Sequence, residues 1–218
     1  MKKEILICAM GLALGQMSLT ASAAQVSFDF TSGNQSYTDG SYVFTGSDNA
    51  TTVSVSAGNE LGNETSYVSG SPWGLLVCTG SAPSSPRSNS SCGSSTNDYH
   101  YIDGGSPSNS GDPDEYVTLD FGGKVTIDSV SFYSSSNGDF DLFADGIQVL
   151  DEQNVGNLVQ FLAIGEASEF KFLADANGDA FKLKSITVSV SEVPVPAAAW
   201  LFGSALLGLG TIKRRRSA

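Results

Sequence analysis

The carboxylates with the most suggestive spacing lie in two short stretches, NGDFDLFADG and DANGD. Hard oxygen ligands of this kind suit Ca²⁺. The spacing of an EF-hand loop is absent, because Gly178 falls at the fourth position of its loop rather than the sixth. The alternative is that these residues occupy hairpin turns and solvent-exposed strand faces. The candidates for a calcium site are Asp139, Asp141, Asp145, Asp175 and Asp179.

Aromatic side chains beside the single histidine are candidates for binding a sugar ring. Tyr99 and Tyr101 flank His100, and an extended chain would present both tyrosines on one side. Trp73 could also stack on a sugar, but we expect it to pack in the core with the apolar residues that follow it.

No catalytic centre is indicated by the sequence. His100 lies in loop-like sequence without a strained G-x-S-x-G turn, so a Ser-His-Asp site is not supported. A zinc site is not supported either, because the chain has one histidine and few cysteines. Glycoside hydrolysis needs two carboxylates at a set separation, and no pair stands out among the 22 Asp and Glu residues after position 23.

Two cysteines, Cys78 and Cys92, follow the first 23 residues. An oxidising compartment favours a disulfide between them. This bond would close a loop of about 15 residues and stabilise the fold by roughly 3 kcal/mol in the chain-entropy model. The alternative is two free buried thiols.

Period-two alternation of apolar and polar residues dominates the middle of the chain. QVSFDF, TTVSVSA and YVTLDF all alternate in this way, which predicts half-buried antiparallel strands. Tight hairpin turns are predicted at three dipeptides that tolerate positive φ angles. These are Asn137-Gly138, Asp145-Gly146 and Asn177-Gly178.

Two segments share a layout that predicts bent strands. KVTIDSVSFY (124–133) and FKLKSITVSV (181–190) each have two alternating apolar positions, an extra residue, and two more apolar positions. The extra residue shifts the phase by one and predicts a bulge or bend in each strand.

Together these patterns predict an all-β fold, a single β-sandwich of the jelly-roll type over residues 24–192. Residues 79–113, rich in Ser, Gly, Asn and Pro, are predicted to form a long loop or a disordered insertion.

The charge of this region excludes some partners. Between residues 24 and 193 the chain has five Lys or Arg and 22 Asp or Glu, a net charge of −17. Such a surface repels nucleic acid and anionic headgroups, so no nucleic-acid partner is expected. It also keeps the domain soluble and favours cations.

Residues 1–23 have the composition of a secretory signal peptide. Lys2 and Lys3 precede an apolar stretch, and Ala21-Ser22-Ala23 fits the A-x-A cleavage pattern. The apolar stretch is shorter than the ~20 residues of a spanning helix. We therefore expect export, with cleavage after Ala23 or one residue later.

The segment 193–218 combines prolines, an apolar run and a basic end. Ala197 to Ile212 holds 16 residues without a charge, which as a helix is ~24 Å long against a hydrocarbon core of ~30 Å. Flanking residues can make up the difference, and the positive-inside rule places the basic end in the cytoplasm. A transmembrane helix with the domain outside is expected. The basic residues are Lys213, Arg214, Arg215 and Arg216.

The order of these features resembles the PEP-CTERM class of bacterial C-terminal sorting signals, most closely its VPLPA type. Members are exported proteins of Gram-negative bacteria that make exopolysaccharide. The resemblance implies that an exosortase, a membrane-bound cysteine transpeptidase-like enzyme, recognises and cleaves the tail. It implies a recognition element of Val193, Pro194, Pro196 and Ala197 together with the basic cluster. Val195 departs from the commonest pattern, which has glutamate at this position.

These features predict a chain that is held transiently in the inner membrane, with its C-terminus in the cytoplasm, and then reaches the cell surface or the extracellular matrix. We expect a structural, adhesive or carbohydrate-binding role in exopolysaccharide or biofilm. One alternative is a secreted polysaccharide-active hydrolase on the same β-sandwich. Another is a permanently membrane-anchored periplasmic protein. No enzyme activity is indicated, and no cofactor other than Ca²⁺.

Overall fold

All regular structure in the described part of the chain is β-strand, which confirms the all-β prediction. The structure is a computed structural model that describes residues 23–31, 41–60, 62, 66–79, 101–105, 114–134, 138–156, 158–160, 164–175 and 178–190. The strands are β1 (Ala24–Asp29), β2 (Tyr42–Thr45), β3 (Thr52–Asn59), β4 (Ser66–Ser71), β5 (Gly74–Thr79), β6 (Ile102–Asp103), β7 (Glu115–Ser134), β8 (Asp139–Ala144), β9 (Ile147–Asn154), β10 (Leu158–Gln160), β11 (Ala167–Leu173) and β12 (Ala180–Val190).

Alternating burial explains why these segments are strands. In β1, Val26 and Phe28 are buried while the residues between and beside them are exposed. In β3, Val53 and Val55 are fully buried and separated by a half-exposed serine. Successive side chains of a strand point to opposite faces, so each strand presents one apolar face to the interior.

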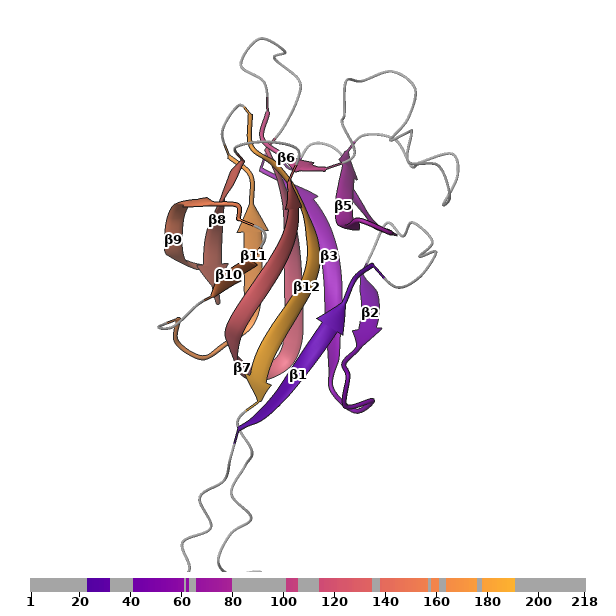
Figure 1. The fold of residues 1–218 in the computed structure, drawn as a ribbon. Helices are drawn as coiled ribbons and strands as arrows, with labels where there is room; N and C mark the ends of the chain where they lie inside the picture. Colours follow the sequence, from indigo (N-terminus) through magenta and orange to yellow (C-terminus); the bar gives the residue numbers. More distant parts are fainter. Residues whose placement is uncertain are drawn as a thin grey trace, which may run out of the picture. The chain divides into compact units, whose positions relative to one another are not determined.

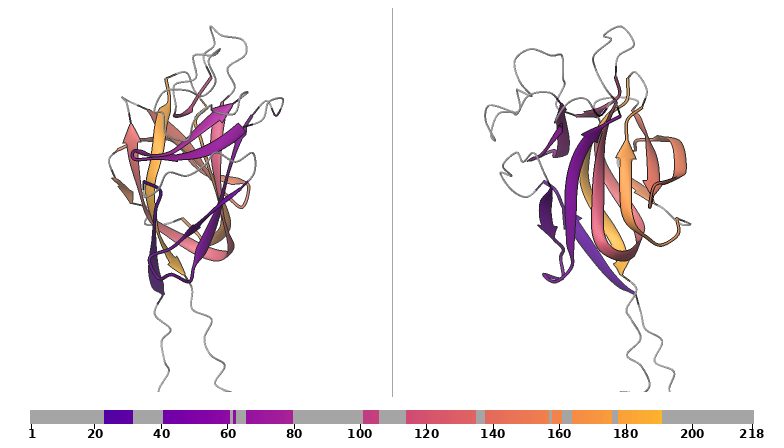
Figure 2. Two further views of the ribbon diagram at one scale, coloured as in Figure 1. Left: turned by 90° about the vertical axis from the view of Figure 1, so that its right-hand side faces the viewer. Right: turned by 180° about the vertical axis from the view of Figure 1, so that it is seen from behind.

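One curled sheet contains all twelve strands (Figure 1). Along its main path the order is β4-β5-β12-β7-β11-β8-β9, with β1 and β6 also on β12, β10 and β3 on β7, and β2 on β3. The long strand β7 makes the curl. Its first part pairs with β3 and β11, and its second part pairs with β12 and β10. Gly122 sits at the bend with φ +65°, a conformation that glycine adopts without strain. Figure 2 shows the sheet curving around its interior.

The predicted bulges in β7 and β12 are confirmed. In β12 the register shifts between Leu183 and Ser185, so the intervening residue has no partner on β7. In β7 the shift comes where Thr187 pairs with Ser129 and the next residue of β12 pairs with Ile127. Each bulge resets the side-chain phase, so the apolar residues on both sides of it face the core.

Only one of the three predicted hairpins forms. Asp145-Gly146 joins β8 to β9 as paired neighbours, with φ +47° and +78°, as a tight hairpin turn requires. The predictions for Asn137-Gly138 and Asn177-Gly178 are wrong, because β8 pairs with β11 and β9 rather than β7, and β12 does not pair with β11. Asn137 and Asn177 themselves lie outside the described residues.

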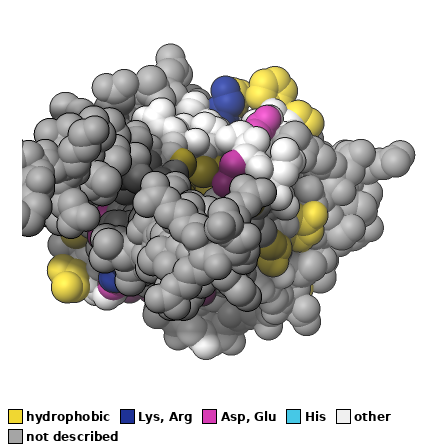
Figure 3. All heavy atoms as spheres, turned by 90° about the horizontal axis from the view of Figure 1, so that it is seen from below, with side chains coloured by type: hydrophobic (Ala, Val, Ile, Leu, Met, Phe, Trp, Pro, Cys, Tyr) yellow, Lys and Arg dark blue, Asp and Glu magenta, His cyan; other side chains and the backbone are white. Residues whose placement is uncertain are grey.

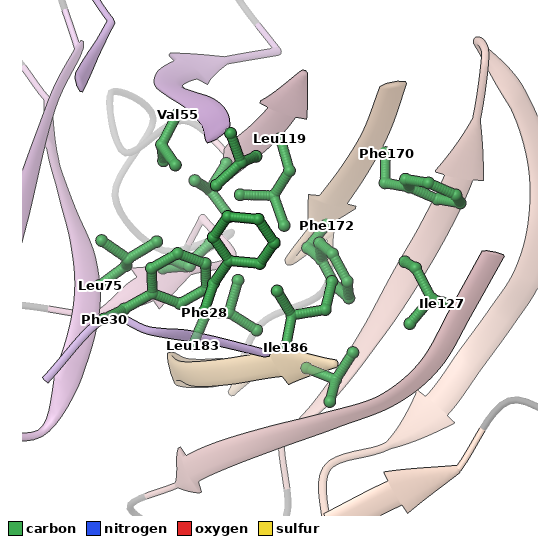
Figure 4. Packing of buried hydrophobic residues seen from close by; sticks show 14 of the residues in the cluster. Phe28, Phe30, Val55, Leu75, Leu119, Ile127, Phe170, Phe172, Leu183 and Ile186 are labelled. Carbon is green, nitrogen blue, oxygen red and sulfur yellow. The ribbon is translucent and has the colours of Figure 1, made fainter. Parts of the chain in front are cut away.

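A continuous core fills the inside of the curl. Side chains from β1, β3, β5, β7, β11 and β12 meet there, as Figure 4 shows for Phe28, Val55, Leu75, Leu119 and Ile186. Phenylalanines dominate it, and Phe132, Phe140, Phe172 and Phe181 form a cluster of rings with centroids 4.9–6.2 Å apart. The two parts of β7 therefore share one interior.

The described unit begins and ends at the same end of the sheet. Ala24, which opens β1, is the register partner of Val190, which closes β12. Val190 also pairs with Val125, close to the β7 bend. We call this the terminal end. The opposite end, here the loop end, holds β6, the last residues of β5 and β11, both ends of β7, and the first residues of β8 and β12.

Several predicted segments lie wholly or largely outside the described residues: residues 1–22, residues 193–218, and most of 79–113. Within 79–113 the structure places β6, and Ile102 is fully buried in the core, so this part of the stretch is not a loop. In the described part of the chain there is no helix with the length and apolar character needed to cross a membrane.

Candidate ligand-binding site

An exposed aromatic pair lies on the outer face of the sheet, on the side of the strands that faces away from the core. Trp73 is 44% exposed and Tyr133 is 37% exposed. Their ring centroids are 5.1 Å apart and their planes are inclined by 39°. The expectation that Trp73 packs in the core is therefore wrong. Two solvent-facing rings in contact provide an apolar surface that a planar or ring-shaped ligand can cover.

The β4–β5 turn fixes Trp73 in this position. The hydroxyl of Ser71 accepts a hydrogen bond from the Trp73 N–H (3.2 Å) and donates one to the Gly74 carbonyl (2.9 Å). Gly74 has φ +120°, and a Cβ there would lie 2.5 Å from the Leu183 carbonyl oxygen. Only glycine allows the turn to approach β12 so closely.

The Trp73 side chain extends across strand β12 to contact Tyr133 of β7. It belongs to a turn on the β5 side of β12, whereas Tyr133 belongs to β7 on the other side. The two rings meet, so Trp73 reaches over the outer face of β12. The β12 residue opposite Tyr133 in the register is Lys182, which places a cation beside the aromatic pair.

Lys182 is an unusual lysine because it is only 6% exposed. Its Nζ lies 4.7 Å from the centroid of the Tyr101 ring, at cation–π distance. Among the residues that the structure describes, no carboxylate or hydrogen-bond acceptor pairs with this Nζ. Burial lowers the pKa of Lys182 below the ordinary lysine value, since desolvation disfavours the charged form.

The structure brings one of the two sequence-predicted sugar candidates to this place. Tyr101 precedes β6, and its carbonyl accepts a hydrogen bond from the Val77 N–H (3.3 Å), while Tyr99 lies outside the described residues. Neither Tyr133 nor Lys182 was singled out from the sequence. The one available signal is that Tyr133 interrupts the serines of VSFYSSS at an outward position. We call Trp73, Tyr101, Tyr133 and Lys182 the outer-face site.

A small second cluster lies on the same outer side of β5. Leu76 and Cys78 are buried there and pack with Tyr67 of β4, while the alternate residues Leu75 and Val77 face the core. Cys78 is disulfide-bonded. Cys92, its predicted partner, lies outside the described residues, so the pairing stays a prediction.

Four of the five predicted calcium ligands come together at the loop end, where Asp179 accepts a hydrogen bond from the Asp139 N–H. Asp139, Asp141 and Asp175 lie near Glu152, which was not predicted. Electrostatic repulsion from Asp139 is the main cause that raises the pKa of Glu152. Burial, followed by repulsion from Asp141, raises the pKa of Asp175. Glu152 also has φ +49°, in a β9 bulge that a local sequence pattern does not reveal.

The oxygens of this acidic cluster are partly engaged by the protein itself. Asp141, which is buried, accepts hydrogen bonds from the Gln148 side chain (2.6 Å) and the Glu152 N–H (2.9 Å). Asp179, also buried, accepts one from the Asp139 N–H (3.3 Å). No group of three metal-ligating side chains in the described residues is arranged to hold an ion. The calcium site stays a prediction.

Asp145 does not belong to the acidic cluster. It lies at the terminal end, where it pairs with Lys124 and accepts hydrogen bonds from the N–H groups of Ser168 (2.9 Å) and Glu169 (3.1 Å). The bond from Lys124, followed by these N–H groups, lowers the pKa of Asp145. The carboxylate therefore holds the β8–β9 turn against β11. In the view from below, the atoms that are not drawn grey include hydrophobic, acidic and basic side chains among white side chains and backbone (Figure 3).

Comparison with protein-family models, with curated proteins and with solved structures found no match to this chain. The chemistry of the outer-face site is therefore inferred from its own geometry.

Proposed function

We propose that this chain is an exported protein of the cell surface or extracellular matrix whose β domain binds carbohydrate of the exopolysaccharide. The observation that carries the proposal is the contact between the exposed rings of Trp73 and Tyr133. Aromatic faces of this kind stack on the apolar faces of sugar rings. The neighbouring ammonium of Lys182 and hydroxyl of Tyr101 supply polar groups that fix orientation.

The domain that presents this site is a single β-sandwich of the jelly-roll type. Support comes from β7, whose two parts pair with different strands. The parts before and after Gly122 would then belong to two facing sheets with a common core of phenylalanines. Sheets that face one another in this way bury their inner faces and leave outer faces, such as that of Lys182, for binding.

Delivery depends on the two ends of the chain. We propose that residues 1–23 direct export and are removed, and that residues 193–218 hold the protein in the inner membrane, with its C-terminus in the cytoplasm, until an exosortase cleaves the tail. The pairing of Ala24 with Val190 supports this proposal. Both processing steps would act on segments that directly precede and follow these two paired residues in the sequence.

Binding is tested by isothermal titration of the mature protein with matrix polysaccharide, comparing wild type with Trp73→Ala. We expect an affinity loss of about 10-fold or more, because an aromatic anchor at the centre of a contact contributes roughly 1–2 kcal/mol or more. The control is Ile147→Ala, which removes a side chain that is 70% exposed on β9 and should leave affinity unchanged. Equal affinity of Trp73→Ala and wild type would contradict the proposal.

An assay of reducing ends in the polysaccharide after the same titration distinguishes binding from hydrolysis. A binding protein leaves the polysaccharide intact, whereas a hydrolase on the same fold releases new reducing ends. The appearance of reducing ends with wild-type protein would replace the proposal by the enzyme alternative.

Processing of the tail is tested by mass spectrometry of the protein that accumulates outside the cell. We expect a mature C-terminus that lacks Lys213, Arg214, Arg215 and Arg216. An intact basic end on the accumulated protein would support the permanently anchored alternative instead.

A further inference from the structure

The outer-face site places a cation between aromatic rings on three neighbouring strands. Tyr101 adjoins β6, Lys182 is on β12 and Tyr133 is on β7, with Lys182 and Tyr133 opposite one another in the register. Trp73 reaches over β12 to contact Tyr133. A ring bound against Trp73 and Tyr133 would therefore lie next to the Lys182 side chain.

The cation of Lys182 lacks the carboxylate partner that Lys124 and Lys171 each have. Lys124 pairs with Asp145, and Lys171 pairs with Glu60 at 3.1 Å. For Lys182, the part of the chain that the structure describes offers the Tyr101 ring and no acceptor, although the residue is only 6% exposed. A buried ammonium has three donors, and leaving them without acceptors is costly.

We propose that the outer-face site takes a sugar that carries a carboxylate, a hexuronic acid unit of an acidic polysaccharide, with Lys182 as the residue that binds the carboxylate. This inference rests on the proposed carbohydrate-binding function. A carboxylate supplies the acceptors that Lys182 lacks and forms charge-assisted hydrogen bonds. The aromatic pair binds the ring of the same unit, so charge and shape are recognised side by side.

The negative net charge of the domain does not prevent a carboxylate from binding next to Lys182. Residues 24–193 carry a net charge of −17, which disfavours long polyanions. At physiological ionic strength, charges beyond about 8 Å are largely screened, and no described carboxylate pairs with Lys182. Short oligosaccharides carry few charges, so they report on the site itself.

The test compares acidic trisaccharides of galacturonic and mannuronic acid with their methyl esters, which keep the rings and remove the charge. We expect wild type to bind at least one acid about 10-fold or more tightly than its ester, as a charge-assisted hydrogen bond allows. Lys182→Met should bind acid and ester equally, at the level of the wild-type ester. Lys124→Met, which makes the same charge change at the Lys124–Asp145 pair, should keep the preference.

The possible outcomes separate this inference from the proposed function. If wild type binds acids and esters equally, or if Lys182→Met keeps the preference for acids, carboxylate recognition by Lys182 is wrong while sugar binding stands. If wild type binds neither form but binds matrix polysaccharide, the hexuronic acid inference is wrong and the proposed function stands. If it binds neither the trisaccharides nor the polysaccharide, both proposals are overturned. Thermal unfolding of each variant establishes that a loss of preference does not come from a loss of fold.

Discussion

Replacing Phe140 with alanine is expected to destabilise the fold by about 3–5 kcal/mol, the range for deleting a buried phenylalanine side chain. Phe140 is 1% exposed. Its ring centroid lies 4.9 Å from that of Phe132, 5.6 Å from Phe172 and 5.9 Å from Phe181. These neighbours come from β7, β11 and β12, so the cavity left by the substitution is lined by several strands and cannot collapse around one of them.

Urea unfolding followed by circular dichroism measures this effect. A single transition that moves to lower urea in Phe140→Ala is expected, because the parts of β7 before and after the bend share one core. The control is Val43→Ala on β2, whose side chain is 57% exposed and should change the free energy of unfolding by less than about 0.5 kcal/mol. A loss below about 1 kcal/mol for Phe140→Ala would show that β8 does not pack as described.

The strand bends could be predicted because their cause is local. The pairs Val125/Ile127 and Val130/Phe132 fall out of phase by one residue, and only a bulge lets both pairs face the core. The structure has the bulges in the corresponding places. The pattern of a single strand contains this information, since the interior requires apolar side chains on both sides of the bulge.

The partners of the strands could not be predicted in the same way. Asn177-Gly178 and Asn137-Gly138 identify turns, but a turn does not determine which strand its neighbour pairs with. In the structure the residues that lead from these dipeptides into β8 and β12 lie side by side: a Cβ on Gly138 would be 3.0 Å from the Ala180 N, and Asp179 accepts a hydrogen bond from the Asp139 N–H. Long-range burial of the phenylalanine cluster decides the pairing, and no local pattern encodes it.

The outer-face site illustrates the same limit. Trp73 has an apolar neighbourhood in the sequence, which favours a core position. In the structure, the positive φ of Gly74 and its approach to the Leu183 carbonyl turn it outward. Lys182 sits in an alternating strand where an outward lysine is ordinary. Its burial comes from the meeting of β5, β6, β7 and β12, segments separated by up to about half of the chain.

Replacing Lys182 with methionine is expected to stabilise the fold at neutral pH by roughly 1–3 kcal/mol, since a buried polar group without a hydrogen-bond partner is removed. For a domain of this size the change corresponds to a rise in Tm of about 2–4 °C per kcal/mol. Methionine has a similar length and fits irregular apolar space. The control Lys124→Met removes an exposed ion pair and should lose at most about 1 kcal/mol. A lower Tm for Lys182→Met at pH 7 would contradict the unpaired, buried state of the ammonium.

The pH dependence gives this prediction a definite sign. Burial holds the pKa of Lys182 in the fold below its ordinary value of 10.5, so the unfolded chain binds more protons wherever the pH lies between the two values. The free energy of unfolding of wild type therefore increases as the pH rises between these two pKa values. The difference in stability between Lys182→Met and wild type should become smaller towards pH 10. A lysine whose removal strengthens the fold and abolishes the preference for acidic sugars would be a residue kept for binding rather than for stability.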